Sequence, residues 1–229
     1  MKIEIWSDVM CPFCYIGKKN FEAALNQIPY KEQINVIWKS YQLDQELSAT
    51  SPTNTLDYLK DKKGLTDEQI TQLNDGIIQF GKEVGIVFNQ ENALAVNTSD
   101  AHRFIQFAQT KGLASEAEEI LFKAYFTDGK NVADFEVLSE LGANIGLNKT
   151  EVTEMLNSDA FVFEVASDGL DAKNIGVTSV PFFVIDRKYA MSGAQPIQYF
   201  VSALTQAYEK DYLNNTSSLG NSCEVDGNC

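Results

Sequence analysis

The sequence is poor in the residue types that bind metals or form crosslinks. Its 229 residues include one histidine, His102, and four cysteines: Cys11, Cys14, Cys223 and Cys229. Four cysteines are too few for a disulfide scaffold in a chain of this length, and a zinc site would need all of them. The second pair has five intervening residues, outside the usual two to four, so zinc is disfavoured. We therefore expect no metal and no cofactor.

Positive charge is also scarce. Eighteen basic residues stand against 32 acidic ones, which gives a net charge of −14. An anionic chain is a poor partner for nucleic acid and for anionic membranes, so we expect neither. No apolar run approaches the roughly 18 residues of a membrane span. Met1 and Lys2 lead straight into apolar residues without the pattern of a signal peptide, so we expect a cytoplasmic protein.

A pair of cysteines at the expected start of a helix is the most informative feature present. The motif Cys11-Pro12-Phe13-Cys14 follows a short strand-like run and precedes a helical pattern. Unpaired N–H groups at a helix start favour a thiolate on Cys11, and proline suits the first helical position. Cys14 lies one turn into the helix, close enough for a disulfide. The motif predicts thiol–disulfide exchange, with Cys11 attacking and Cys14 resolving.

Periodicity along the chain predicts an α/β protein interrupted by helices. Strands are expected over 2–8 and 34–43, a hairpin over 182–186 and 189–192, and helices over 11–27 and 196–212. The stretch 55–171 shows helical patterns and no convincing strand. Two helix starts in it carry capping pairs, Thr66 with Gln69 and Ser115 with Glu118. Aromatic residues at helical spacing are expected to form the core of this block: Phe104, Phe107, Phe122, Tyr125 and Phe126.

Three segments, 6–14, 176–185 and 192–196, together resemble the DsbA family of the thioredoxin superfamily, in its FrnE-like cytoplasmic branch. The resemblance spans nearly the whole chain. It implies a thioredoxin fold with a large all-helical insertion. The domains would be a discontinuous thioredoxin-fold domain, 1–54 and 166–213, a helical insertion, 55–165, and a flexible tail, 214–229, carrying the second cysteine pair.

The resemblance also implies that the Val180–Pro181 peptide bond is cis and faces the dithiol. The backbone beside such a proline can pair with an extended substrate segment. From the residues alone, a simple turn before a strand is an equally good interpretation of this dipeptide.

Two functions remain open after the motifs are considered. The first is an oxidoreductase or isomerase acting on protein thiols and disulfides, with glutathione or a thioredoxin-type reductant as a further partner. The alternative is a glutathione-dependent isomerase or transferase of small aromatic molecules, of the 2-hydroxychromene-2-carboxylate isomerase or kappa-class glutathione transferase type. Those relatives typically have serine at the position of Cys11 and need no second thiol, so the presence of Cys14 favours the first function.

Residues around the motif refine this prediction. Phe13 stands where periplasmic DsbA proteins typically have histidine, which predicts a less oxidising dithiol. Asp8 is interpreted either as a proton relay for Cys14 or as a loop residue bonded to local backbone. Cys223 and Cys229 form either a redox relay to Cys11 or a passive pair. His102 is expected to be a satisfied helix histidine, with a role above Cys11 as the less favoured interpretation.

Overall fold

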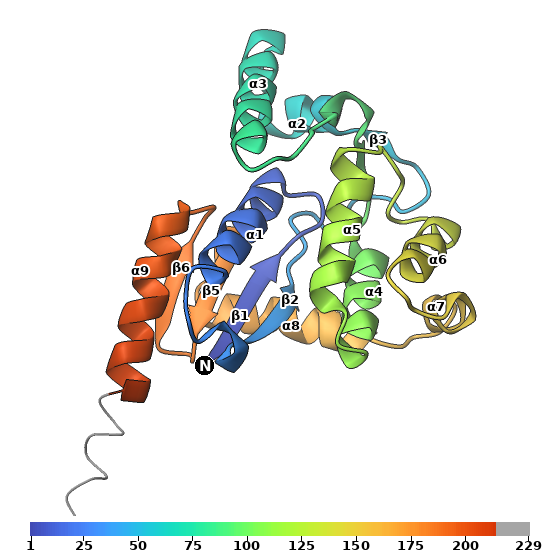
Figure 1. Ribbon diagram of the computed structural model, residues 1–229. Coiled ribbons are helices and arrows are strands. Elements are labelled where there is room, and N and C mark those ends of the chain that lie inside the picture. The colour runs from blue at the N-terminus through green and yellow to red at the C-terminus, as the bar shows by residue number, and fades with distance from the viewer. Residues whose placement is uncertain (214–229) are drawn as a thin grey trace, which may run out of the picture.

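The structure, a computed structural model, describes residues 1–213, and its centre is a four-stranded mixed sheet (Figure 1). The strands are β1 (Lys2–Ser7), β2 (Asn35–Ser40), β5 (Phe182–Ile185) and β6 (Tyr189–Ser192). Their order is β2-β1-β5-β6, and β1 runs parallel to β2 but antiparallel to β5. Every residue of β1 after Lys2 is buried, because this central strand is covered on both faces.

The described part of the chain also contains nine α-helices. They are α1 (Pro12–Leu25), α2 (Thr55–Lys63), α3 (Asp67–Glu83), α4 (Ser99–Thr110), α5 (Ala114–Phe126), α6 (Phe135–Asn144), α7 (Lys149–Leu156), α8 (Val162–Asn174) and α9 (Ile197–Tyr208). Two 3₁₀ turns, Lys31–Gln33 and Gln90–Asn92, and a π-helical turn, Glu209–Leu213, complete the regular structure. Helices α1 and α9 pack together, whereas α4 and α8 contact β2.

The six helices α2 to α7, which lie between β2 and α8 in the sequence, form the helical block. In Figure 1, α2 and α3 stand beyond the amino-terminal end of α1, and α4 to α7 lie beside the sheet. Of the five aromatic residues expected in its core, four are fully buried and Phe107 is half-buried, which confirms the expectation. Tyr15 of α1 stacks on Phe122 of α5 with ring centroids 5.0 Å apart, which joins the block to the sheet.

The predicted hairpin is confirmed as β5 and β6, but the long middle contains more than the sequence predicted. The two-residue strand β4 (Leu94–Ala95) lies within it and pairs with β3 (Thr53–Asn54) just before it, so the expectation of no strand over 55–171 was wrong. Such short strands leave no period in the sequence. Helix α2 was also missed, because its residues are mostly polar. Its start is instead marked by Asn54, whose side chain accepts hydrogen bonds from two backbone amides of the first turn.

The two predicted capping pairs have opposite outcomes. Thr66 and Gln69 form the expected capping box at the start of α3. The second pair was wrong, because α5 begins at Ala114 without a side-chain cap. The Ser115 hydroxyl instead accepts a hydrogen bond from Trp38 Nε1 at 3.0 Å, and Glu118 is buried in the interior.

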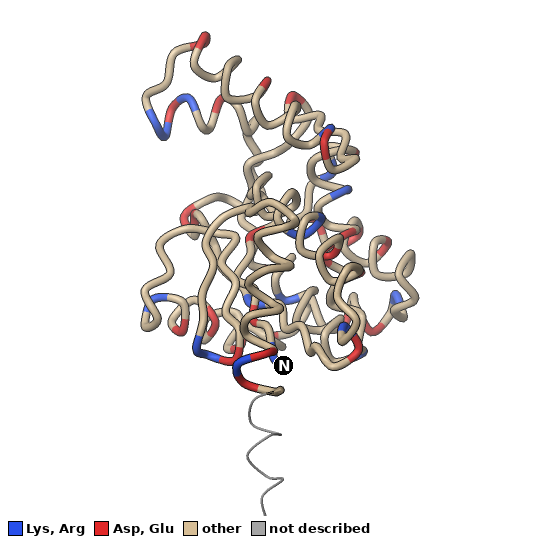
Figure 2. Tube along the Cα trace, turned by 60° about the vertical axis from the view of Figure 1, so that its left-hand side comes forward, with Lys and Arg blue, Asp and Glu red and all other residues tan. Residues whose placement is uncertain are grey.

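Acidic and basic positions are interspersed along the chain in the view of Figure 2. Some of these charges connect distant elements. Arg187, between β5 and β6, forms ion pairs with the buried carboxylate of Glu4 in β1 and with Asp171 in α8. Within residues 1–213, no helix combines the length and the apolar character needed to cross a membrane.

Candidate active site

The two cysteines of the motif lie at the amino-terminal end of α1. Cys11 is the N-cap residue and Pro12 is the first helical residue, as the sequence predicted. The Cys11 amide donates a hydrogen bond to the Asp8 carbonyl at 3.0 Å, which closes the turn between β1 and α1. Both thiols are free; Cys11 is 6% exposed and lines an open cavity, whereas Cys14 is 1% exposed. Both thiols are therefore buried, but Cys11 faces a cavity whereas Cys14 is enclosed.

The Val180–Pro181 peptide bond is cis, as the resemblance implied. The Cys11 thiol donates a hydrogen bond to the Val180 carbonyl oxygen, with sulfur and oxygen 3.6 Å apart. The Pro181 carbonyl accepts a hydrogen bond from the Gly193 amide at 2.8 Å. The three sequence segments noted above, 6–14, 176–185 and 192–196, therefore meet at the dithiol.

A cavity of about 380 Å³ opens beside Cys11 on the side of the helical block. Its walls include the apolar side chains of Leu43, Leu59 and Ile77. Lys62 and Lys63 of α2 also line it, and both are exposed; Lys62 pairs with Asp44 at 2.8 Å. The cavity can therefore take an apolar group next to the attacking sulfur, with positive charge close by.

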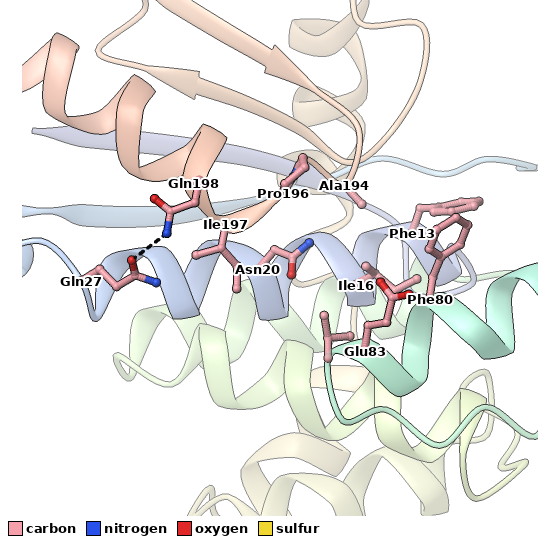
Figure 3. Close-up of a pocket in the computed structure, with 11 residues that line it drawn as sticks. Phe13, Ile16, Asn20, Gln27, Phe80, Glu83, Ala194, Pro196, Ile197 and Gln198 are labelled. Atoms are coloured by element: carbon pink, nitrogen blue, oxygen red, sulfur yellow. Dashed lines mark hydrogen bonds between the residues drawn. The ribbon is translucent and has the colours of Figure 1, made fainter.

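A second hollow, of about 520 Å³, runs along α1 on the other side of Phe13 (Figure 3). Ile16 and Asn20 of α1 and Pro196 and Ile197 near the start of α9 line it. Phe13 borders both hollows, and its ring lies 6.4 Å from that of Phe80 in α3. Phe13 is therefore shared by the two hollows, whereas Phe80 lines only the second.

The Cys14 thiol lies on the inner side of the dithiol. Burial raises the pKa of Cys14 well above its usual range, and the neighbouring Cys11 sulfur acts in the same direction. The Asp8 backbone and the Ser7 hydroxyl favour its thiolate, but they do not reverse the shift. Cys14 therefore keeps its proton at neutral pH, and its attack on a mixed disulfide requires a proton acceptor.

Asp8 is fully buried in the loop between β1 and α1. Its Oδ2 accepts a hydrogen bond from the Leu43 amide at 2.7 Å, and its Oδ1 accepts one from the Met10 amide at 3.4 Å. The Met10 bond is the local backbone contact that one interpretation expected, whereas the shorter bond reaches Leu43 in the segment after β2; the proton relay stays a prediction. Asp8 also faces a titratable group, because His102 Nε2 of α4 lies 3.4 Å from Oδ1.

Two residues of the helical block, His102 and Glu118, are further buried titratable groups whose charges interact with that of Asp8. Burial by itself lowers the pKa of His102, but contact with Asp8 outweighs it, so the pKa lies above the usual value. Burial raises the pKa of Glu118 to about 7, although His102 and Lys18 both act to lower it. Lys18 lies one turn after Cys14 on α1 and pairs with Glu22 at 2.6 Å and with Glu119 at 2.7 Å.

The burial of Glu118 was not predicted from the sequence, although a signal for it was present. Glu118 lies on the stripe of α5 that also carries Ala114, Leu121 and Tyr125, and this stripe is buried. A carboxyl group in the apolar stripe of a helix is the unusual feature that marks it. His102 is buried on α4 as a helix residue, but its Nε2 faces Asp8 Oδ1 at 3.4 Å without hydrogen-bond geometry, so the expectation of a satisfied histidine was wrong. The less favoured interpretation also fails, because His102 does not line the cavity beside Cys11.

Cys223 and Cys229 lie outside the residues that the structure describes, so their predicted relay stays a prediction. Among residues 1–213, no group of three or more histidine, cysteine, aspartate or glutamate side chains is arranged to hold a metal ion.

Comparison with known families identifies the class. Residues 2–205 match the family described as "DSBA-like thioredoxin domain". The chain therefore belongs to the DsbA-like thioredoxin family, and its fold is the thioredoxin fold with a helical insertion.

Individual relatives agree with this assignment. The chain is 35% identical to a "probable DsbA oxidoreductase", SCO1869, from Streptomyces coelicolor, with a TM-score of 0.87 over 92% of this chain and 91% of that one. It is 25% identical over 211 residues to YwbO, an uncharacterized protein of Bacillus subtilis, covering 91% of this chain and 98% of YwbO.

Two more distant structures share the fold alone. A cytosolic disulfide reductase, DsbM, from Pseudomonas aeruginosa is 16% identical with a TM-score of 0.65, covering 90% of this chain and 98% of that one. A 2-hydroxychromene-2-carboxylate isomerase is 13% identical with a TM-score of 0.66, covering 92% and 98%.

Proposed function

We propose that this protein is a thiol–disulfide oxidoreductase or isomerase that exchanges disulfides with protein substrates through Cys11 and Cys14. The observation that carries this proposal is the free dithiol at the start of α1, with Cys11 lining a cavity and facing the Val180 carbonyl while Cys14 is enclosed. The Cys11 thiolate attacks a substrate disulfide and forms a mixed disulfide. Cys14 then attacks the Cys11 sulfur and releases the substrate thiol; the reverse sequence oxidises a substrate.

The surroundings of Cys11 support a polypeptide substrate. The Val180 carbonyl lies beside the sulfur, in a segment that can pair with an extended chain as an added strand. Apolar hollows lie on either side of Phe13, so side chains that flank the substrate cysteine can each occupy one.

Insulin reduction and refolding of scrambled ribonuclease test this function together. Wild-type protein is expected to be active in at least one assay, and Cys11→Ser is expected to be inactive in both. Undiminished activity of Cys11→Ser would remove Cys11 as the nucleophile. The relative rates in the two assays tell whether reduction or isomerisation dominates.

The competing proposal is a glutathione-dependent isomerase or transferase of small aromatic molecules, which the shared fold of the 2-hydroxychromene-2-carboxylate isomerase supports. Such chemistry needs no second thiol. Isomerisation of 2-hydroxychromene-2-carboxylate with glutathione, retained in Cys14→Ser, would favour it. We expect no turnover of this compound by wild type, because the dithiol is intact.

We place the protein in the cytoplasm, with glutathione or a thioredoxin-type protein returning the dithiol to its working redox state. The description of the Pseudomonas aeruginosa relative as a cytosolic disulfide reductase supports this setting, as does a solved structure of that relative with glutathione. Equilibration of the dithiol in glutathione buffers, followed by mass spectrometry, tests whether glutathione exchanges with Cys11.

We also propose that Cys223 and Cys229 exchange disulfides with the Cys11–Cys14 pair. Truncation after Leu213 is then expected to leave the fold intact and to change the rate of insulin reduction several-fold. Identical kinetics of the truncated and full chains, with several substrates, would make the pair passive.

A further inference from the structure

The cavity beside Cys11 has a local charge opposite in sign to that of the whole chain. Of the described residues that line it, only Lys62 and Lys63 are charged, and both lie in the last turn of α2. The chain as a whole has 32 acidic residues against 18 basic ones. Charged surfaces favour partners of the opposite sign, so positive charge beside the attacking sulfur favours substrates that carry negative charge near theirs.

The two lysines differ in whether their charge is already paired. Lys62 Nζ lies 2.8 Å from Asp44 Oδ2, so its charge is balanced within the protein. Lys63 is exposed and forms neither an ion pair nor a side-chain hydrogen bond with any residue from 1 to 213. Lysines in the last turn of a helix are also stabilised by the helix dipole, so their presence alone does not indicate a site. The distinguishing feature of Lys63 is an unpaired charge on a residue that lines the cavity of the nucleophile.

A buried amide donor in the wall of the cavity also lacks a partner. Gln90, in the 3₁₀ turn before β4, lines the cavity and is 2% exposed, and its Nε2 has no hydrogen-bond partner among the described residues. The two hydroxyl groups of the wall are paired, Tyr58 with Asp44 at 2.7 Å and Thr55 with Tyr125 at 3.0 Å. An unpaired buried donor costs stability, and only an acceptor can satisfy an N–H group. The cavity therefore matches an occupant that supplies an acceptor.

We propose that the cavity beside Cys11 selects polypeptide substrates that carry an acidic residue next to the reacting cysteine, with Lys63 and Gln90 as the specificity-determining residues. Cys11 lines the same cavity, so the residue next to the substrate cysteine is brought to it as the mixed disulfide forms. The apolar walls contact the methylene groups of the acidic side chain, and its carboxylate accepts hydrogen bonds from both unpaired groups. This inference rests on the disulfide exchange proposed above and names the class of its substrates.

Peptides activated as mixed disulfides with 2-thiopyridine measure this selection in a single step. The Cys11 thiolate attacks the peptide sulfur: the bond between these two sulfurs forms, the bond to thiopyridine breaks, and the leaving thiolate takes a proton from solvent. Cys11 is thereby oxidised and thiopyridine is reduced, and the released pyridine-2-thione is followed by its absorbance. This leaving group adds no carboxylate of its own. The full-length protein carries Cys14→Ser, Cys223→Ser and Cys229→Ser, so that only Cys11 reacts.

The peptides are identical except for Glu, Gln or Lys immediately before or after the cysteine. The net charge of −14 alone would make the Lys peptides the fastest and the Glu peptides the slowest. We expect the reverse at one of the two positions, with the Glu peptide reacting about threefold faster than the Gln peptide. Added salt should reduce this preference, because the Lys63 side chain is exposed and its charge is screened.

Substitutions at the two residues test their roles separately. Lys63→Gln should abolish the preference for Glu, and Lys63→Glu should transfer it to the Lys peptide. Gln90→Leu removes the buried donor and should reduce the preference, because a carboxylate is a stronger acceptor than an amide. Lys60→Gln is the matched control and should retain the preference, since Lys60 lies in the same turn of α2, pairs with Asp67 and lines neither hollow.

Equal rates for the Glu and Gln peptides at both positions would overturn this inference, while release of pyridine-2-thione would still support the proposed function. No release with any peptide would contradict the proposed function itself. Glutathione activated in the same way separates a second source of carboxylate. If Lys63→Gln slowed only the reaction with activated glutathione and the peptides showed no preference, Lys63 would act on glutathione and the inference would be overturned.

Discussion

Apolar side chains are exposed on the outer side of the dithiol and titratable side chains are buried on its inner side, which is the reverse of the usual arrangement in a globular protein. On the outer side, Phe13 is 38% exposed and Phe80 is 51% exposed, and both border hollows. On the inner side, the charged or titratable groups of Asp8, His102 and Glu118 are buried. Exposed apolar groups and buried titratable groups each cost stability. The contrast gives each side of the dithiol its own test, by substrate affinity on the outer side and by pH dependence on the inner side.

Substitutions on the two sides should therefore have separable effects. Changes on the outer side should alter apparent affinity for substrate and leave pH profiles unchanged. Changes on the inner side should alter pH dependence and stability and leave affinity unchanged. A substitution that moved both properties together would weaken the distinction.

The largest effect is expected from substitution of the cysteines, of which Cys11 lies on the outer side of the dithiol and Cys14 on the inner side. Cys11→Ser should form no mixed disulfide with reduced or oxidised substrate, because the attacking sulfur is lost. Cys14→Ser should accumulate mixed disulfides, because nothing resolves them. Mass spectrometry of acid-quenched reactions distinguishes the two. Mixed disulfides through Cys14 in the Cys11→Ser variant would show that the inner thiol is accessible.

Glu118 tests the inner side through stability. Its pKa of about 7 lies above the ordinary value of 4.5, so the unfolded chain ionises first as pH rises. Ionisation therefore destabilises the fold increasingly between these two values, and the penalty is constant above them. At about pH 8, Glu118→Gln should raise the free energy of unfolding by on the order of 3 kcal/mol, at roughly 1.36 kcal/mol per pKa unit.

Urea unfolding at about pH 8 and pH 4 measures this change, with Glu116→Gln as control. Little difference is expected at the lower pH, where the carboxyl is protonated in both states. A gain in stability at pH 8 would show that burial of the Glu118 carboxyl is a cost to the fold. A loss of stability at pH 8 would instead mark Glu118 as a structural residue.

Phe80 tests the outer side. Phe80→Ala removes the aromatic partner of Phe13 and part of the wall of the larger hollow. Loss of an apolar contact of this size should raise KM for insulin about tenfold and leave the pH profile unchanged. Phe163→Ala on α8 is the control, since Phe163 is 78% exposed and borders neither hollow. Equal effects of the two substitutions would argue against substrate binding at Phe80.

The smallest expected effect concerns Phe13, which cannot donate a hydrogen bond to the neighbouring sulfur. Phe13→His adds a donor and a partial positive charge beside the Cys11 thiolate, so the reduced form should gain stability. The dithiol should become more oxidising by about 20 mV, roughly a fivefold change in the equilibrium constant. Equilibration in glutathione buffers measures this change, and a shift toward a more reducing dithiol would contradict the argument.

Local patterns predicted much of the fold. Alternation located β1 and the hairpin, and the Thr66–Gln69 pair located the start of α3, because each signal lies within a few residues. The two-residue strands β3 and β4 were not predictable, since their pairing depends on segments about 40 residues apart. The same limit explains the wrong interpretation of Ser115, whose hydroxyl bonds to Trp38 in β2 rather than to its own helix.

The candidate site also divides into residues with a local sequence signal and residues without one. The cysteine motif and Pro181 were predicted because each belongs to a short segment that can be recognised in the sequence. The buried groups Asp8, His102 and Glu118 were not predicted, because His102 contacts Asp8 only in the folded chain and Glu118 is brought within range of their charges from another helix. Their charge also argues against burial when each is considered alone.

Gly17 has a consequence for any attempt to engineer this protein. A Cβ there would lie 2.9 Å from Pro181 Cγ, which is too close for two carbon atoms, and 3.5 Å from the Cα of Ala194. A library randomised at this position should return glycine almost exclusively when selected for disulfide exchange. Position 17 must therefore remain glycine when the dithiol or either hollow is redesigned.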